Sequence, residues 1–97
     1  MKTIDNALYI GRVPVREIAR AYGTPTYVYD EQRIRANYAR VAAAFRTHYP
    51  DFHLYYAIKA NDNLAVAAIV TGEGAGIDAA SVNEILLAKE LGLDGER

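Results

Sequence analysis

Phe52-His53-Leu54-Tyr55-Tyr56-Ala57-Ile58-Lys59 is the segment that most directly indicates a fold class. Its first seven residues are nearly all apolar, which is typical of a strand buried on both faces, as in a parallel sheet. The polar residues 59–63 follow at once, and apolar helical spacing resumes at Leu64. The pattern predicts a strand over residues 52–58, a polar loop, and a helix from Leu64 to about Thr71. We expect this helix to turn three residues inward: Ala65, Ala68 and Ile69.

A second unit of the same kind follows along the chain. Residues 72–76 (Gly-Glu-Gly-Ala-Gly) predict a turn and residues 77–80 a short strand, while Ser81 and Glu84 form a capping box. This capping box opens a helix that we expect to end at Gly92. The glycines do not match G-x-G-x-x-G and follow a helix rather than a strand, so we interpret them as a turn and not a phosphate site. Strands that alternate with helices predict an α/β fold with right-handed βαβ units.

Upstream of these units, the pattern predicts three local elements. Pro14 can open a short helix that Gly23 ends, and residues 26–29 (Thr-Tyr-Val-Tyr) have the composition of a short strand. Asp30 can cap a long helix that Tyr49-Pro50-Asp51 ends. The buried stripe of this helix is expected at Ile34, Tyr38, Val41, Ala42 and Phe45.

Composition bounds the kind of protein. The 97 residues include 11 Lys plus Arg against 12 Asp plus Glu, and no stretch concentrates one sign, so nucleic acids and anionic membranes are disfavoured as partners. Cysteine is absent, and His48 and His53 lie in no metal-ligand spacing, so we expect no metal site. The sequence has no signal-peptide pattern and no run of about 18 apolar residues, so we expect a cytoplasmic protein.

Lys59 is the first candidate for chemistry, because it follows the predicted buried strand. Alternation would place it on the same face as Tyr55 and Ala57. An amine at the carboxyl end of a barrel strand can project into a site formed by the βα loops. If desolvation lowers its pKa, the neutral amine can attack an aldehyde to form an imine. A solvated loop lysine is the structural alternative.

Asp78 is the second candidate, since it stands between Ile77 and Ala79 in the next predicted strand. A carboxylate in apolar surroundings costs several kcal/mol unless it is paired, so we expect a specific partner, which could be purely structural. Neighbouring parallel strands could bring Asp78 and Lys59 to the same face of the sheet. Glu84, in contrast, is explained by its capping box.

Three segments in order resemble one enzyme family. Tyr56-Ala57-Ile58-Lys59-Ala60-Asn61 resembles the cofactor-lysine motif of the fold type III, or alanine-racemase-like, pyridoxal-phosphate enzymes. Residues 23–30 (Gly-Thr-Pro-Thr-Tyr-Val-Tyr-Asp) look like the GTP-x-YVYD opening of diaminopimelate decarboxylases. Gly76-Ile77-Asp78-Ala79-Ala80-Ser81 with Glu84 resembles the family's G-x-D-x-x-S-x-x-E block. Val82-Asn83 departs from that block, where diaminopimelate decarboxylases usually have glycines.

The resemblance implies a fold and a cofactor. Residues 31–97 would be the first part of a (β/α)8 barrel that binds pyridoxal 5'-phosphate, with Lys59 as its internal aldimine and Asp78 near the cofactor. Residues 1–30 would be an N-terminal segment with a short helix and a strand, and the strand would belong to a C-terminal β domain that the 97 residues do not include. A closed barrel needs on the order of 250 residues, so we expect this chain to be part of a longer protein and inactive alone.

The resemblance also implies a function. We expect a pyridoxal-phosphate-dependent carboxy-lyase of lysine biosynthesis that converts meso-diaminopimelate to L-lysine and CO2, with a homodimeric parent. The alternatives are an ornithine or arginine decarboxylase or an amino-acid racemase of the same fold. A third possibility is a non-catalytic module that binds the cofactor. Residues that bind the cofactor's phosphate and recognise the substrate would lie beyond Arg97.

Overall fold

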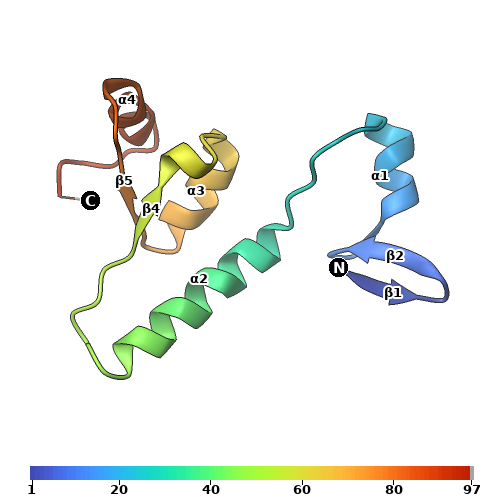
Figure 1. Cartoon of the computed structure of the whole chain (residues 1–97), viewed down its shortest axis with the longest axis horizontal. Coiled ribbons are helices and arrows are strands. Elements are labelled where there is room, and N and C mark those ends of the chain that lie inside the picture. Colours follow the sequence, from blue (N-terminus) through green and yellow to red (C-terminus); the bar gives the residue numbers. More distant parts are fainter. Residues whose placement is uncertain (97) are drawn as a thin grey trace.

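The structure, a computed structural model, describes residues 1–96 and shows a mixed α/β arrangement. A small antiparallel sheet with one helix lies at the N-terminal end, and a two-stranded parallel sheet with three helices follows it (Figure 1). In chain order, the elements are β1 (Lys2–Ile4), β2 (Ala7–Ile10), β3 (Val13–Pro14), α1 (Val15–Tyr22), α2 (Glu31–Arg46), β4 (Tyr55–Ala57), the 3₁₀ turn η1 (Ile58–Ala60), α3 (Leu64–Gly72), β5 (Gly76–Asp78) and α4 (Val82–Glu90). The predicted α/β class is confirmed, whereas the partial (β/α)8 barrel and the domain division at residue 30 remain predictions.

The sheet β1-β2-β3 was not predicted. Its first hairpin turns through Asp5 and Asn6, whose φ angles of 48° and 58° suit the right-handed twist of a two-residue hairpin loop. Gly11, with φ 59°, makes the next turn. An Asp-Asn pair between short runs of β-forming residues was the signal available in the sequence.

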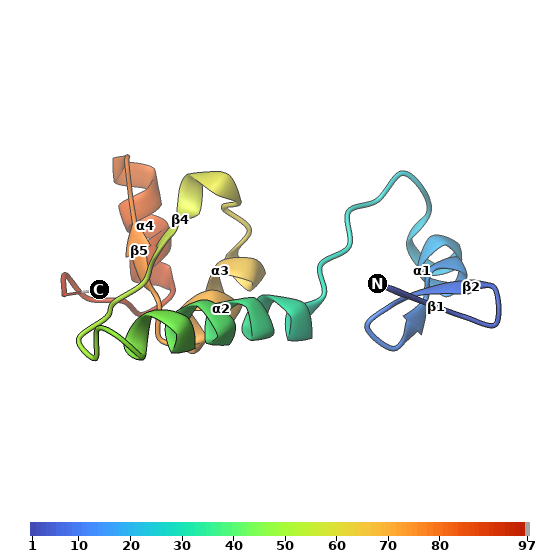
Figure 2. The same ribbon diagram turned by 60° about the horizontal axis from the view of Figure 1, so that its bottom comes forward.

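The short helix is confirmed, and the strand expected after it is not formed within residues 1–96. Helix α1 begins after Pro14 and ends at Gly23, whose φ is 79°. Residues 26–29 form no strand, because no described strand lies beside them to pair with their backbone groups. They run as an open connector between α1 and α2 (Figure 2). The Tyr27 side chain in this connector is 91% exposed.

Helix α2 follows the prediction closely. The Asp30 side chain caps it by accepting a hydrogen bond from the Arg33 backbone N–H. Of the predicted stripe, Tyr38 and Ala42 are buried, Ile34 is partly buried, and Val41 and Phe45 are 37% and 50% exposed. The exposed Phe45 still makes a packing contact, since its ring stacks on that of Phe52 with centroids 4.7 Å apart. That contact ties the end of α2 to the segment before β4.

The parallel pair β4–β5 is the centre of the second part. Both strands are shorter than the predicted ranges 52–58 and 77–80, because each has a single neighbour and pairing ends where that neighbour ends. Helix α3 also presents a different face from the predicted one. It buries Val66, Ala67 and Val70 and exposes Ala65 and Ala68.

The rotation of α3 has a physical reason. Thr71 is its only polar side chain, so the sequence does not mark a solvent face. Contacts with α2 and β4 therefore decide which side of the helix is covered. The predicted helix after Ser81 is confirmed as α4, which ends before Gly92 with φ 75°. Within residues 1–96, none of the helices has the length and apolar character needed to cross a membrane.

Candidate functional site

The two predicted site residues come together at the carboxyl ends of β4 and β5. In the parallel register, Ala57 is opposite Asp78, the last residue of β5. Lys59 follows Ala57 by two residues, in the turn η1. The two residues therefore lie at one edge of the sheet, whereas the expectation that they share a face of it remains a prediction.

Lys59 itself is not on a strand, which corrects the expected alternation. Strand β4 ends at Ala57, and a 3₁₀ turn carries Lys59, so a period of two no longer sets its direction. The side chain of the preceding Ile58 is fully buried, while Lys59 is exposed. Burial of Ile58 thus holds the backbone next to Lys59, while the lysine amine remains accessible to a ligand.

The backbone that carries Lys59 is held by three hydrogen bonds. The Asn61 N–H donates to the Ile58 carbonyl oxygen at 3.1 Å, and the Tyr56 hydroxyl donates to the Asn61 carbonyl oxygen at 2.9 Å. The Asn61 side chain accepts from the Asn63 N–H at 3.0 Å. Asn63 in turn caps α3 by accepting from the N–H groups of the first helical residues. The loop after β4 is therefore continuous with the start of a packed helix.

Tyr56 is the residue of this site that sequence reasoning missed. Burial raises the pKa of the Tyr56 hydroxyl above its ordinary value, and the charges of Tyr29 and Asp62 raise it further. The phenol therefore remains protonated and able to donate. The available signal was a tyrosine in the buried strand, whose hydroxyl needs a partner.

Asp78 lies differently from the expectation. Its carboxylate is exposed, and within residues 1–96 the structure gives it no hydrogen bond or ion pair, so the expected specific partner is absent from this part of the chain. The reason is its place at the end of the sheet, where water reaches a charge that the apolar neighbours Ile77 and Ala79 would otherwise have desolvated.

Glu84 has the structural role expected of it. The Ser81 hydroxyl oxygen accepts from the Glu84 N–H at 3.3 Å. The Glu84 carboxylate accepts from the Ala80 N–H at 2.6 Å, one residue before the position that a standard capping box uses. Both bonds fix the start of α4 just after the end of β5.

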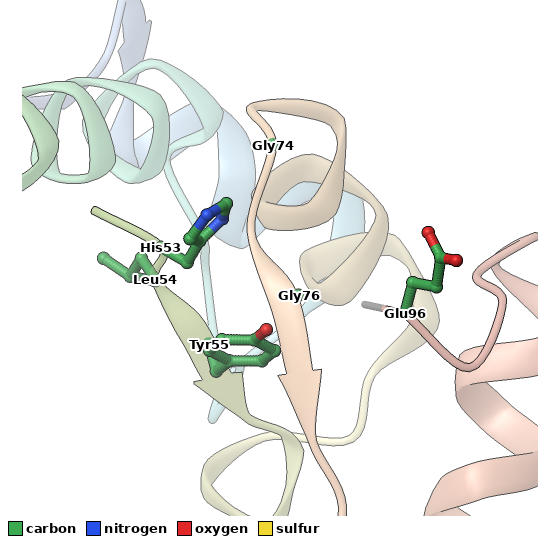
Figure 3. Close-up of a pocket in the computed structure, with 6 residues that line it drawn as sticks. All are labelled: His53, Leu54, Tyr55, Gly74, Gly76 and Glu96. Atoms are coloured by element: carbon green, nitrogen blue, oxygen red, sulfur yellow. The ribbon is translucent and has the colours of Figure 1, made fainter. Parts of the chain in front are cut away.

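The glycine-rich turn lies at the opposite edge of the sheet, before the first residue of β5. A cavity of about 310 Å³ opens there, at the amino ends of β4 and β5 (Figure 3). Its lining consists of His53, Leu54, Tyr55, Gly74, Gly76 and Glu96. Because the cavity lies at the amino ends of the strands, it is separate from the edge that carries Lys59. Among the described residues, no three His, Cys, Asp or Glu side chains gather as metal ligands would.

Comparison with known proteins shows the family to which this chain is similar. Residues 32–97 match the family model described as pyridoxal-dependent decarboxylase, pyridoxal binding domain. A diaminopimelate decarboxylase of Methanothermobacter thermautotrophicus is 51% identical over 90 residues, which are 93% of this chain and 21% of that relative. A diaminopimelate decarboxylase of Aquifex aeolicus is 38% identical over 96% of this chain and 21% of the relative.

A third relative carries a different name. Protein TabA of Pseudomonas amygdali pv. tabaci is 36% identical over 82% of this chain and 19% of the relative. No solved structure matches the chain. The chain spans about a fifth of the length of these curated relatives.

Proposed function

The chain belongs to the pyridoxal-dependent decarboxylases through their pyridoxal-binding domain, and from this premise we propose that it supplies the cofactor lysine of a diaminopimelate decarboxylase. The proposed lysine is Lys59, and the proposed reaction converts meso-diaminopimelate to L-lysine and CO2. The observation that carries the proposal is the position of Lys59, exposed and two residues beyond Ala57, at the edge where Asp78 ends the neighbouring parallel strand.

The residues present fit pyridoxal phosphate by their chemistry. An exposed primary amine can reach an aldehyde, and Lys59 provides one on a backbone held by Ile58 and Asn61. Asp78 adds a carboxylate at the same edge, which can accept hydrogen bonds or balance a positive charge. We propose Lys59 and Asp78 as the cofactor-binding residues within this chain.

Each residue then has a defined task. Bound pyridoxal phosphate supplies an electron sink for the electron pair that remains when the substrate carboxylate leaves as CO2. Lys59 would hold the cofactor through its Nζ atom in the absence of substrate and would leave that position open to the substrate amine. Asp78 would place negative charge beside the cofactor. The turn from Ile58 to Asn61 keeps the lysine at the sheet edge throughout.

Reduction with borohydride after incubation with pyridoxal phosphate tests the role of Lys59. The chain has three lysines, Lys2, Lys59 and Lys89, and all three are exposed, so accessibility alone does not favour one of them. Peptide mass mapping of the whole gene product is expected to find the label on Lys59. Equal labelling of the three lysines would show that Lys59 is an ordinary surface lysine.

Release of CO2 tests the substrate. We expect the whole gene product to decarboxylate meso-diaminopimelate in preference to ornithine or arginine, and Lys59→Ala to abolish the release. The reason to retain other substrates of the same family is the Val82-Asn83 departure, together with a relative named Protein TabA. Preferred release from ornithine or arginine would replace the proposed substrate, and racemisation without CO2 would replace the reaction.

Two further properties belong to this proposal. By resemblance to the family, we propose that the whole enzyme is a cytoplasmic homodimer and that the 97 residues alone are inactive. Sedimentation of the whole gene product should give twice the mass of one chain, and fractionation of cells should recover it without detergent. A monomer that decarboxylates at full rate would contradict the homodimer.

A further inference from the structure

Tyr56 joins the strand to the turn that carries Lys59. Its side chain is partly buried and packs against both apolar clusters of the second part of the chain. One cluster contains Tyr38 and Ala42 of α2, and the other contains Ile58 and Ala67. A ring held on two sides fixes where its hydroxyl points.

The hydroxyl closes a short loop around Lys59. Tyr56 Oη donates to the Asn61 carbonyl oxygen at 2.9 Å, so residues 56–61 form a ring closed by one side chain. Within that ring, the Asn61 N–H also bonds to the Ile58 carbonyl. Lys59 thus follows a fully buried Ile58 and stands two residues before Asn61, which is held through both its N–H and its carbonyl oxygen.

We propose that Tyr56 is a positioning residue for Lys59, which acts through the Asn61 carbonyl to hold the turn in the conformation that presents the lysine amine at the sheet edge beside Asp78. This inference rests on the proposed function of Lys59. It adds that a partly buried side chain of the strand determines how effectively that lysine captures an aldehyde. Tyr56 itself touches neither Lys59's amine nor any ligand in this role.

The protonation of Tyr56 supports the role. A phenol of ordinary pKa is already protonated at neutral pH, and burial raises the pKa of Tyr56 further, so the donor hydrogen is present under the conditions of the test. Asp62 and Tyr29, whose charges contribute to that rise, are both acceptors as anions and would each oppose loss of the proton.

Tyr56→Phe removes the hydroxyl and keeps the ring, and Tyr55→Phe is the matched control. Tyr55 is the adjacent residue of the same strand, is 54% exposed, and makes no side-chain hydrogen bond within residues 1–96. In the whole gene product, Tyr56→Phe is expected to lower the preference of pyridoxal phosphate for Lys59 over Lys2 and Lys89 by about threefold to tenfold. Tyr55→Phe is expected to leave that preference unchanged.

Steady-state kinetics separates positioning from general structure. Because the turn orients the lysine rather than the substrate, Tyr56→Phe should lower kcat with meso-diaminopimelate by a similar factor and change KM little. A purely structural hydroxyl would instead lower the urea midpoint and leave both the labelling preference and kcat of the folded protein unchanged. That result would overturn the proposal.

A rescue variant keeps the test decisive if Tyr56→Phe folds poorly. Tyr56→4-aminophenylalanine places an N–H donor where the hydroxyl was and should restore the preference for Lys59 relative to Tyr56→Phe. Failure of this rescue in a folded protein would also overturn the proposal. Two failures can be told apart. Equal labelling of all three lysines in the unaltered protein would overturn the role of Lys59 itself. A preference for Lys59 in the unaltered protein that Tyr56→Phe leaves unchanged would overturn only the role of Tyr56.

Discussion

Ala57 and Asp78 are opposite each other in the parallel register, and both are the last residues of their strands. Strands β4 and β5 therefore end side by side. Lys59 follows the end of β4, and the capped start of α4 follows the end of β5. Polar groups that follow the two strands gather at one edge, as they do at the carboxyl ends of strands in barrel enzymes.

Asp78→Asn should separate cofactor binding from stability. The carboxylate is exposed and unpaired within residues 1–96, so we expect the free energy of unfolding to change by less than about 0.5 kcal/mol. The affinity for pyridoxal phosphate, measured by absorbance titration, should fall on the order of tenfold if the charge is used in binding. Asp51→Asn, a fully exposed carboxylate near the other sheet edge, is the control and should leave affinity unchanged.

Gly74→Ala should destabilise the turn before β5. Gly74 has φ 105°, which side chains rarely adopt, and an added Cβ would lie 3.3 Å from the buried Tyr38 hydroxyl oxygen. We expect a loss on the order of 1–3 kcal/mol in urea denaturation. Gly72→Ala is the matched control, since Gly72 is helical with open space around it and should be neutral or slightly stabilising. Equal effects of the two substitutions would show that Gly74 is not constrained.

Ser81→Ala should weaken the start of α4. Its hydroxyl oxygen caps the helix by accepting from the Glu84 N–H, and loss of such a cap costs about 1 kcal/mol. Hydrogen exchange is expected to accelerate in the first turn of α4 and not in α2. Asn83→Ala, in the same turn but without a capping role, should leave that protection intact.

Stability should depend on the ionisation of Tyr56 at high pH. Its pKa is raised in the folded protein above the ordinary 10.0, so the neutral phenol favours folding. This contribution is complete below the unfolded pKa and is lost as pH rises through the folded pKa. The difference in unfolding free energy between the unaltered protein and Tyr56→Phe should therefore be constant from pH 7 to about 9 and shrink above about 10. A difference that stays constant to pH 12 would contradict the raised pKa.

Local signals in the sequence were sufficient for the helices. Pro14 and Gly23 bound α1, Asp30 caps α2, and Ser81 caps α4, because capping depends on residues that are near in sequence. The edge that joins Lys59 and Asp78 was also predictable, since parallel strands of successive βα units share a direction. Their proposed roles came from the resemblance and not from spacing.

Other features depended on distant contacts. Strand lengths follow from how far β4 and β5 lie beside each other, and the rotation of α3 follows from packing, which its almost wholly apolar sequence leaves open. The bond from Tyr56 to Asn61 needed the 3₁₀ turn that brings the two together, and no pattern of period two or 3.6 contains such a turn. Asp78 is exposed because β5 ends at this residue. Its apolar sequence neighbours Ile77 and Ala79 gave no sign of that end and suggested a buried carboxylate instead.

The parallel pairing of β4 with β5 has a consequence for vectorial synthesis on the ribosome. Gly76 is made about twenty residues after its partner Tyr55, and at roughly 5–20 residues per second the first strand waits on the order of seconds for the second. Helix α2 is already complete by then, and its Tyr38 and Ala42 belong to the cluster against which Tyr56 packs. The earlier helix can therefore shelter one face of the nascent strand before its sheet partner has emerged from the ribosome.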